Sequence, residues 1–181
     1  MTRLVIPPTQ TGHVRCSVVH SPIGGVGIAV DGDAVCAVSF GAALTDVDGA
    51  APPPALLAEA ERQLREYFAG ERTDFALPLV VRRGSEFERA VWKAIAAIPY
   101  GETLSYGAIA RSVGDSGGAR AVGLACNRNP LPIIVPCHRV IGSDGKLVGF
   151  GGGIERKRWL LQLEARIHIE RTFMGDNGDA G

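Results

Sequence analysis

The sequence has no long hydrophobic run and no close pair of cysteines. No apolar stretch approaches the roughly 20 residues that a membrane-spanning helix requires, and the first ten residues, MTRLVIPPTQ, lack the continuous apolar core of a signal peptide. The cysteines are scattered, as is typical of free thiols in a reducing compartment: Cys16, Cys36, Cys126 and Cys137. These absences exclude a disulfide scaffold and a membrane partner, and we expect a soluble intracellular protein, cytoplasmic or, in a eukaryote, nuclear.

The chain also lacks net charge, since 19 Lys and Arg balance 19 Asp and Glu. Such a balance alone would argue against a nucleic-acid partner. The charges are unevenly distributed, however: residues 1–81 hold 5 basic and 9 acidic residues (net −4), whereas residues 82–171 hold 14 basic and 8 acidic residues (net +6). This asymmetry favours a polyanion partner for the second half, although a solvated basic face would give the same counts.

Length and composition are sufficient for two small domains. The chain has 181 residues, 46% of them hydrophobic, and single domains have on the order of 100 residues. We divide it into a loose leader (1–12), an N-terminal α+β domain (13–81), a C-terminal domain (82–171) and a tail (172–181). The tail is rich in Gly and Asp, and we expect it to be disordered.

The N-terminal domain combines strands with one helix. Alternating small and hydrophobic residues predict strands over 26–30 and 35–40, joined by an Asp-Gly-Asp hairpin turn. Residues 54–70 carry hydrophobic residues at helical spacing and end in Gly70, which predicts an amphipathic helix. Residues 75–81, with an internal proline, predict a short edge strand.

The C-terminal domain begins with a clear helix start. Ser85 and Glu88 form a capping box, and the hydrophobic stripe that follows predicts a helix ending before Pro99. Two short helices are then predicted over 105–113 and 119–128, separated by a glycine-containing turn. This is the outline of a helix-turn-helix.

The second of these short helices consists mostly of Ala and Gly, so its backbone can approach another surface closely. Arg120 at its start and Arg128 at its end are available for phosphate contacts. A helix packed in the core with two solvated arginines is the alternative. Residues 154–166 predict a final amphipathic helix that buries Trp159 and carries Glu164 near its end.

The segment PLPIIVPCHRV (130–140) holds the strongest candidate for chemistry. Its three prolines exclude a helix, and we expect a buried extended segment that ends at Pro136. Cys137 and His138 follow, and a thiolate near a base is a nucleophile. Neighbouring side chains point to different sides of a chain, so His138 needs a turn or a bridging water to reach Cys137. On these residues alone, a half-buried cysteine beside a surface His-Arg pair is equally open.

Four motifs in order and spacing carry a resemblance to a known family: YGETLSYGAIA, ARAVGLACNRNP, IIVPCHRVI and GFGGGIERKRWLLQLE. They resemble the O6-alkylguanine-DNA alkyltransferases, the suicide repair proteins also called methylated-DNA–protein-cysteine methyltransferases, and PCHRV is highly specific to them. SPIGGVGIAV, AVSFG and QLREYFAG agree loosely with the N-terminal domain of that family. The resemblance implies a ribonuclease-H-like N-terminal domain and a winged-helix C-terminal domain with the helix-turn-helix.

The resemblance also implies the chemistry. Cys137 is the alkyl acceptor in a stoichiometric, irreversible reaction. The alkyl group comes from O6 of guanine, or from O4 of thymine, in duplex DNA. A water links the thiol to His138, and Glu164 orients the imidazole. Tyr106 crowds the target phosphate and protonates guanine N3, and Asn129 ties the recognition helix to the cysteine segment.

Reaching a base inside a duplex requires flipping the nucleotide. The resemblance assigns Arg120 as the finger that fills the vacated stack, with the Ala/Gly-rich helix in the minor groove, where little sequence is read. The expected DNA contacts are Tyr106, Arg120, Ala121, Gly123 and Arg128.

The loop over 148–152 is expected to line the guanine pocket through Val148, Phe150, Gly151 and Gly152. Some family members have Tyr-Ser where this chain has Phe150-Gly151, so the Gly151 N–H replaces a hydroxyl as the donor to O6. The glycines suggest a mobile wall that admits bulkier alkyl groups. A strict methyl preference over benzyl would contradict this hypothesis.

No cofactor and no metal are predicted. His13, Cys16 and His20, with Cys36 as a fourth ligand, match no zinc spacing, and the zinc ligands of some family members are not matched. We expect a monomer, with cooperative DNA binding left open. Two alternatives remain: a winged-helix protein that recognises alkylated DNA without repairing it, and a thiol redox sensor that pairs Cys126 with Cys137.

Overall fold

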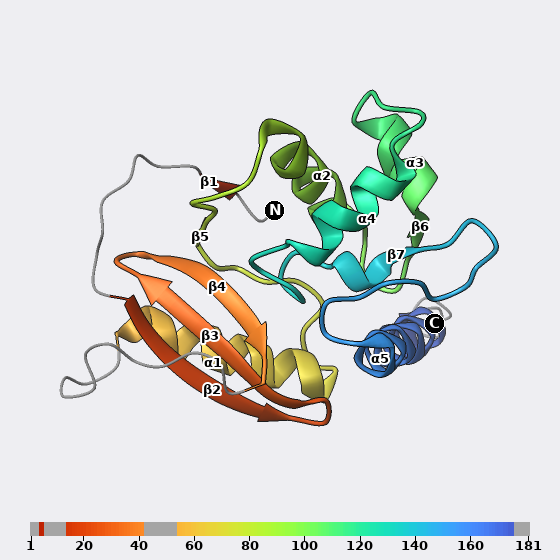
Figure 1. Ribbon diagram of the computed structural model, residues 1–181. Helices are drawn as coiled ribbons and strands as arrows, with labels where there is room; N and C mark the ends of the chain where they lie inside the picture. Colours follow the sequence, from red (N-terminus) through yellow and green to blue (C-terminus); the bar gives the residue numbers. More distant parts are fainter. Residues whose placement is uncertain (1–3, 6–13, 42–53, 176–181) are drawn as a thin grey trace.

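The computed structural model describes residues 4–5, 14–41 and 54–175, which form two lobes (Figure 1). The first lobe is a five-stranded sheet with strand order β1-β5-β4-β3-β2 and helix α1 against it. Its elements are β1 (Leu4–Val5), β2 (Val14–Ser21), β3 (Gly24–Asp31), β4 (Ala34–Phe40), α1 (Ala55–Ala69) and β5 (Leu79–Val80).

Strands β2, β3 and β4 form an antiparallel meander, so the predicted hairpin is confirmed. The predicted edge strand over 75–81 is wrong in its position and length. Only Leu79–Val80 is a strand, and it lies between β1 and β4, parallel to both. The reason is that Leu4–Val5, assigned to the loose leader, pairs along its outer side; the rest of the leader lies outside the described residues.

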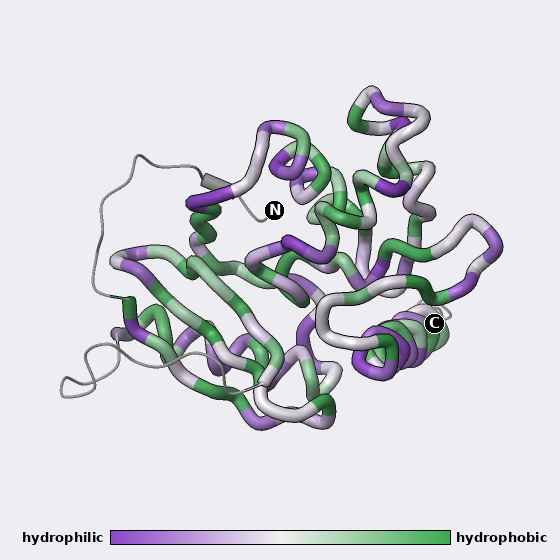
Figure 2. The backbone as a smooth tube through the Cα atoms, viewed as in Figure 1, coloured by the Kyte–Doolittle hydropathy of each residue, from purple (hydrophilic) through white to green (hydrophobic). Residues whose placement is uncertain are grey.

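The helix predicted over residues 54–70 is confirmed as α1, and it covers one face of the meander. Its buried positions recur at helical spacing, among them Leu57, Leu64 and Tyr67. Figure 2 shows hydrophobic and hydrophilic residues interleaved along the helix, which is the pattern of an element half embedded in a core. Gly70 ends the helix with φ of 79°, a left-handed conformation that favours glycine.

The second lobe holds the remaining helices and a two-stranded parallel sheet: α2 (Glu86–Ala96), β6 (Leu104–Ser105), α3 (Tyr106–Ser112), α4 (Ala119–Asn127), the 3₁₀ helix η1 (Cys137–Arg139), β7 (Val140–Ile141) and α5 (Ile154–Gly175). The capping box is present, since Ser85 Oγ accepts from Glu88 N–H at 3.2 Å and Glu88 Oε2 accepts from Ser85 N–H at 2.7 Å. Helices α3 and α4 pack on each other and on α2, so the two predicted short helices form a compact pair.

The expectation of an extended segment before Cys137 is wrong. Residues 131–135 are buried as predicted, but they form a turn closed by an isolated bridge between Pro132 and Val135. Val135 N–H donates to the Leu131 carbonyl at 2.7 Å. The prolines exclude a helix, but they do not oblige the chain to extend, and here local hydrogen bonds fold it back.

The expected disordered tail is wrong for its first residues, because α5 continues to Gly175; residues 176–181 lie outside the described ones. The extension packs on the end of α1: Ile167 is buried, and Arg171 donates to the Glu71 carbonyl at 3.1 Å. Trp159, expected to be buried, is only half-buried and lies 6.0 Å from the Phe68 ring.

One hydrophobic core runs through both lobes, from Val19 in β2 to Ile167 in α5. The lobes therefore share an interface in which side chains of the first can reach the chemistry of the second. Over residues 4–5, 14–41 and 54–175, no helix combines the length and hydrophobicity needed to cross a membrane.

Candidate active site

Cys137 is held by a tight turn at the end of α4. Asn129 Nδ2 donates to the Val135 carbonyl at 2.7 Å, and Asn129 Oδ1 accepts from Leu131 N–H at 3.0 Å. The amide of Asn129 therefore fastens the end of the helix to the cysteine segment. Cys137 follows as the first residue of η1, which contacts α2 and α5, and its side chain is buried.

The turn contains the only non-glycine residue with a positive φ among those that the structure describes. Ile133 has φ of 75°, a conformation that a β-branched side chain rarely adopts. Its side chain is fully buried in the core, so packing holds it there against the local backbone preference. The strain adjoins the candidate nucleophile, as is common at functional sites.

His138 and Glu164 form a buried pair. His138 Nε2 lies 2.8 Å from Glu164 Oε1, and both side chains are almost inaccessible to solvent. A carboxylate only accepts, so the imidazole carries its proton on Nε2. His138 Nδ1 is buried and has no partner within the described part of the chain. It is the free acceptor of the neutral tautomer, on the residue next to Cys137.

The Glu164 carboxylate accepts four further hydrogen bonds, from three residues. Arg139 donates Nε to Oε2 at 2.8 Å and Nη2 to Oε1 at 3.0 Å, and Gly101 N–H donates to Oε2 at 3.2 Å. Tyr67 Oη donates to Oε1 at 2.6 Å. Tyr67 belongs to α1, so the first lobe supplies one donor to the pair in the second. Every donor restrains the carboxylate that orients His138.

These contacts decide the charge of the pair. Burial alone would raise the pKa of Glu164, but His138 and Arg139 outweigh it and hold the pKa of Glu164 well below its usual range. Burial lowers the pKa of His138, against the opposing pull of Glu164. The carboxylate is therefore ionised and balanced by Arg139, while the imidazole is neutral and able to accept a proton.

The resting thiol of Cys137 is neutral too. Burial raises its pKa above the ordinary value, while a hydrogen bond with Asn129 and the positive charge of Lys157 act in the opposite direction. A neutral thiol beside a neutral imidazole forms a thiolate only when the proton moves to His138. The candidate nucleophile is therefore protonated in the free protein, and its proton has a neutral acceptor nearby.

Lys157 joins this site to the loop over 148–152. Its side chain is fully buried, and Nζ donates to the Val140 carbonyl at 2.6 Å and the Val148 carbonyl at 3.2 Å. It also donates to Tyr106 Oη at 3.3 Å. Tyr106 Oη in turn donates to the Val148 carbonyl at 2.7 Å. The lysine therefore places a cation and a phenol along one wall of the site.

A cavity of about 290 Å³ opens beside Tyr106, between α4 and this loop. Its lining joins predicted DNA contacts with predicted pocket residues: Tyr106, Arg120, Gly123, Val148 and Gly149, with Ala119, Leu124 and Asn127. Leu124 on α4 is exposed although it is large and hydrophobic, and Arg120 is exposed at the start of the helix. Two motifs far apart in sequence thus share one concave surface.

Other predicted residues lie outside this cavity. Ala121 is half-buried on α4. Arg128 is paired with Glu88 of α2 at 3.0 Å and lines a separate cavity with Arg83. A Cβ on Gly151 would lie 3.6 Å from the Asn127 carbonyl oxygen, so this glycine faces the end of α4. Phe150 and Gly152 pack instead on Phe40 of the first lobe.

Sequence reasoning missed three residues that complete the site: Tyr67, Lys157 and Phe40. Lys157 had a signal, because it shares one helical face with Leu160 and Glu164, and a charge on a buried stripe needs partners. Tyr67 was recognised only as part of a buried stripe, and nothing local indicated where its hydroxyl points. Phe40 had no local signal.

Residues of metal-binding type do not gather in the described ranges, where no group of three or more His, Cys, Asp or Glu could hold an ion. Cys36 Sγ donates to the Ala29 carbonyl at 3.5 Å, and burial raises its pKa to about 11. His13 lies outside the described residues.

The fold and the site define a two-domain protein with a helix-turn-helix and a buried cysteine beside a histidine–glutamate pair. Comparison with known proteins narrows this class. The family model described as 6-O-methylguanine DNA methyltransferase, DNA binding domain, matches residues 86–166, and the ribonuclease-like domain of the same family matches residues 14–81. The chain therefore belongs to the 6-O-methylguanine DNA methyltransferase family, and the predicted fold class is confirmed.

Individual relatives agree. A methylated-DNA–protein-cysteine methyltransferase of Mycobacterium leprae is 49% identical over 153 residues, covering 83% of this chain and 92% of the relative. One from Methanosarcina acetivorans is 46% identical over 151 residues, covering 82% and 96%. The crystal structure of Mycobacterium tuberculosis OGT in complex with DNA matches with a TM-score of 0.75 and 49% identity, covering 86% of this chain and 94% of that chain.

Proposed function

We propose that this protein repairs alkylated DNA by moving the alkyl group from O6 of guanine, and from O4 of thymine, to its own Cys137 in one irreversible turnover. The observation that carries the proposal is the buried Cys137–His138–Glu164 arrangement beneath a helix-turn-helix. A hydrolase or redox site would not need a DNA-binding helix pair at its mouth. The solved relative in complex with DNA supports DNA as the partner.

The transfer balances without a cofactor. His138 Nδ1 takes the thiol proton of Cys137 through a bridging water, and the thiolate forms an S–C bond with the alkyl carbon. The C–O6 bond breaks, its electron pair stays on guanine, and Tyr106 gives a proton to N3. The proton on His138 returns to Tyr106 through solvent, so that overall the thiol proton ends on guanine. No electrons are exchanged with another molecule.

Each polar neighbour has a role in this sequence. Glu164 keeps the His138 proton on Nε2 and stabilises the imidazolium that forms. Lys157, whose charge favours the thiolate, also donates to Tyr106 Oη and stabilises the phenol oxygen when it gives up its proton. Tyr106, which donates to Val148 in the free protein, must turn toward the flipped base.

The DNA reaches Cys137 by nucleotide flipping, because the buried thiol cannot contact a base inside a duplex. The exposed face of α4, poor in bulky residues, enters the minor groove, and Arg120 fills the vacated position in the stack. The groove carries little sequence information, which suits damage in any sequence. The protein acts as a monomer, and we place it in the compartment that holds the genome.

The decisive experiment is intact-protein mass spectrometry after mixing with duplex DNA that contains one O6-methylguanine. We expect a gain of one methyl group, saturating at one per chain and mapping to Cys137. Cys137→Ser should gain nothing and still bind the DNA, whereas Cys36→Ser, at a half-buried cysteine of β4, should react normally. Binding of the damaged DNA by the wild type with no mass gain would indicate a recognition protein, and a loss of two hydrogens would indicate a disulfide.

A further inference from the structure

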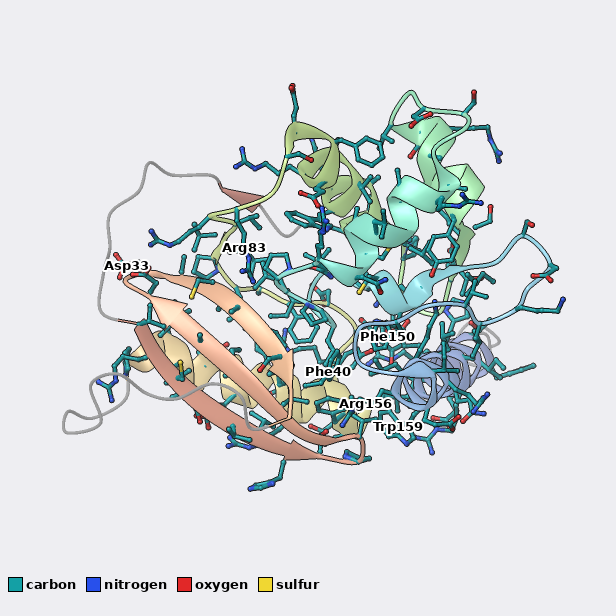
Figure 3. The ribbon with its side chains drawn as sticks, in the orientation of Figure 1. Asp33, Phe40, Arg83, Phe150, Arg156 and Trp159 are labelled. Atoms are coloured by element: carbon teal, nitrogen blue, oxygen red, sulfur yellow. The ribbon has the colours of Figure 1, made fainter. Side chains whose placement is uncertain are left out.

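The loop that forms one wall of the proposed substrate pocket is anchored on two sides. On the inner side, Tyr106 and Lys157 hold the carbonyls of Val148 and Gly149. On the outer side, the anchor includes a side chain of the first lobe, Phe40. Figure 3 shows this outer anchor, with Phe40, Phe150 and Arg156 gathered where the end of β4 meets the loop.

Four contacts form the outer anchor. The ring centroids of Phe40 and Phe150 are 5.4 Å apart with the planes tilted by 55°, a favourable aromatic arrangement. The Arg156 guanidinium lies 5.6 Å from the Phe40 centroid. Arg156 also donates Nη1 to the Gly152 carbonyl at 2.7 Å and Nε to the Ile23 carbonyl, in the first lobe, at 2.8 Å. Loop, α5 and sheet therefore meet at one ring.

Gly152 shows how closely the loop approaches that ring. A Cβ there would lie 2.5 Å from Phe40 Cδ2 and 2.8 Å from Phe150 Cε1, distances that real atoms do not adopt. Only glycine lets the backbone pass between the rings. The rest of the loop is also rich in glycine and has few side chains of its own to pack, so its position depends strongly on where Phe150 is held.

We propose that Phe40 is a positioning residue that sets the width of the substrate pocket by holding Phe150, and so limits the size of the alkyl group that Cys137 can accept. The inference rests on the proposed function, since it concerns the selectivity of that same site. It gives the first lobe a part in choosing the substrate. The substrate class that it restricts is guanine with a large O6 substituent, for which benzyl is the probe.

The test compares single-turnover transfer from O6-methylguanine and O6-benzylguanine in the same duplex, for the wild type and Phe40→Ala. Loss of one aromatic pair corresponds to a change of roughly 2- to 12-fold, and we expect the benzyl-to-methyl rate ratio to rise by that factor. Phe150→Ala should raise the ratio similarly, and the double variant should exceed neither single variant, because both remove one contact. An unchanged ratio in Phe40→Ala would overturn the proposal.

The matched control is Phe68→Leu. Phe68 of α1 also joins the two lobes through an aromatic contact, with Trp159 at 6.0 Å, but it does not touch the loop. A general loosening of the interface would change the benzyl-to-methyl rate ratio in both variants. Loss of the outer anchor changes this ratio only in Phe40→Ala. A ratio change of equal size in Phe68→Leu therefore counts against the proposal. Denaturant unfolding of every variant confirms that the compared proteins are folded.

A second measurement does not depend on alkyl transfer. Hydrogen exchange of a peptide covering 147–154 should be faster in Phe40→Ala than in the wild type, and unchanged in Phe68→Leu. If the wild type transfers no alkyl group, the proposed function fails, while this measurement still tests whether Phe40 holds the loop through the outer anchor. If transfer occurs and exchange in the loop is the same in Phe40→Ala and the wild type, the proposed positioning role of Phe40 is wrong and the proposed function stands.

Discussion

At the scale of single residues, the site depends on buried charges that are paired and on one buried acceptor that is not. Glu164 has Arg139 and Tyr67 as fixed partners. Its carboxylate therefore stays ionised, and the side chain loses little conformational freedom in doing so. His138 Nδ1 has no partner in the described part of the chain. An unpaired buried acceptor destabilises a fold by about 1–3 kcal/mol, and this one belongs to the residue that we propose accepts the thiol proton.

The ionisation of these residues predicts how stability depends on pH. Burial lowers the pKa of His138 from its ordinary 6.5, so the unfolded chain binds a proton before the folded one as pH falls, and stability declines below about pH 6.5. Glu164, whose pKa is also lowered, adds a second decline below about pH 4.3. Urea unfolding at pH 8, 6 and 4 would measure both.

The control for this titration is His138→Gln, which should lose the decline between pH 7 and 5 but keep the one at lower pH. An equal decline between pH 7 and 5 in wild type and variant would show that other groups cause it.

Lys157 offers a second prediction at the residue scale. Lys157→Met keeps most of the buried volume but removes the donors to Tyr106 and the loop carbonyls, together with the charge that favours the Cys137 thiolate. Hydrogen bonds from a charged group are worth about 1.5–3 kcal/mol each, so we expect single-turnover transfer to slow roughly tenfold or more. Lys146→Met, at an exposed lysine, should react at the wild-type rate.

At the scale of elements, α4 and α5 meet across the site with different tasks. α4 ends at the turn that Asn129 closes, so the position of α4 and that of Cys137 are coupled through one amide. α5 carries Lys157 and Glu164 on one buried face. A rigid helix holds both groups at a fixed separation, as a proton relay requires.

The position of Arg120 on α4 predicts a difference between substrates. Arg120→Ala should slow repair of O6-methylguanine in duplex DNA by roughly tenfold or more, because flipping a base costs a few kcal/mol that the finger offsets. Reaction with free O6-benzylguanine needs no flipping and should change little. Equal slowing of both reactions would contradict the finger role. Arg158→Ala, at an exposed arginine of α5, should slow neither.

At the scale of the whole molecule, the first lobe contributes side chains to a site in the second. Tyr67 reaches Glu164 from a position 97 residues earlier in the chain, and Phe40 meets Phe150 at the loop. The shared hydrophobic core fixes the position of one lobe relative to the other. The N-terminal domain therefore supplies side chains to the candidate site in addition to stabilising the fold.

This arrangement predicts that Tyr67→Phe, a change in the first lobe, affects Glu164 and His138 in the second lobe. Losing a buried hydrogen bond to a carboxylate should lower the free energy of unfolding by about 1.5–3 kcal/mol and shift the pH profile of alkyl transfer, since Glu164 orients His138. Tyr100→Phe is the matched control, because the buried Tyr100 hydroxyl has no partner among the described residues. It should be neutral or stabilising, and a cost equal to that of Tyr67→Phe would refute the assignment.

Much of the fold was predictable because its determinants are local. The capping residue Ser85, the helix stop at Gly70 and the turn between β3 and β4 act through neighbours within a few positions. The motif around Cys137 pointed to the site for the same reason. Two of the failed predictions concern places where a distant segment intervened: Leu4–Val5 covers β5, and the end of α1 supports the last turns of α5.

The sequence by itself determined the candidate nucleophile, the helices that flank it and the family. Helical periodicity, capping residues and a contiguous motif can all be recognised in a sequence before its tertiary structure is known. The tertiary structure alone decided the protonation of His138, the hydrogen-bond partners of Lys157 and the contacts that Tyr67 and Phe40 make with the second lobe. These depend on desolvation and on contacts between residues about a hundred positions apart, and no local pattern in a chain encodes which distant atoms will exclude water from a given side chain.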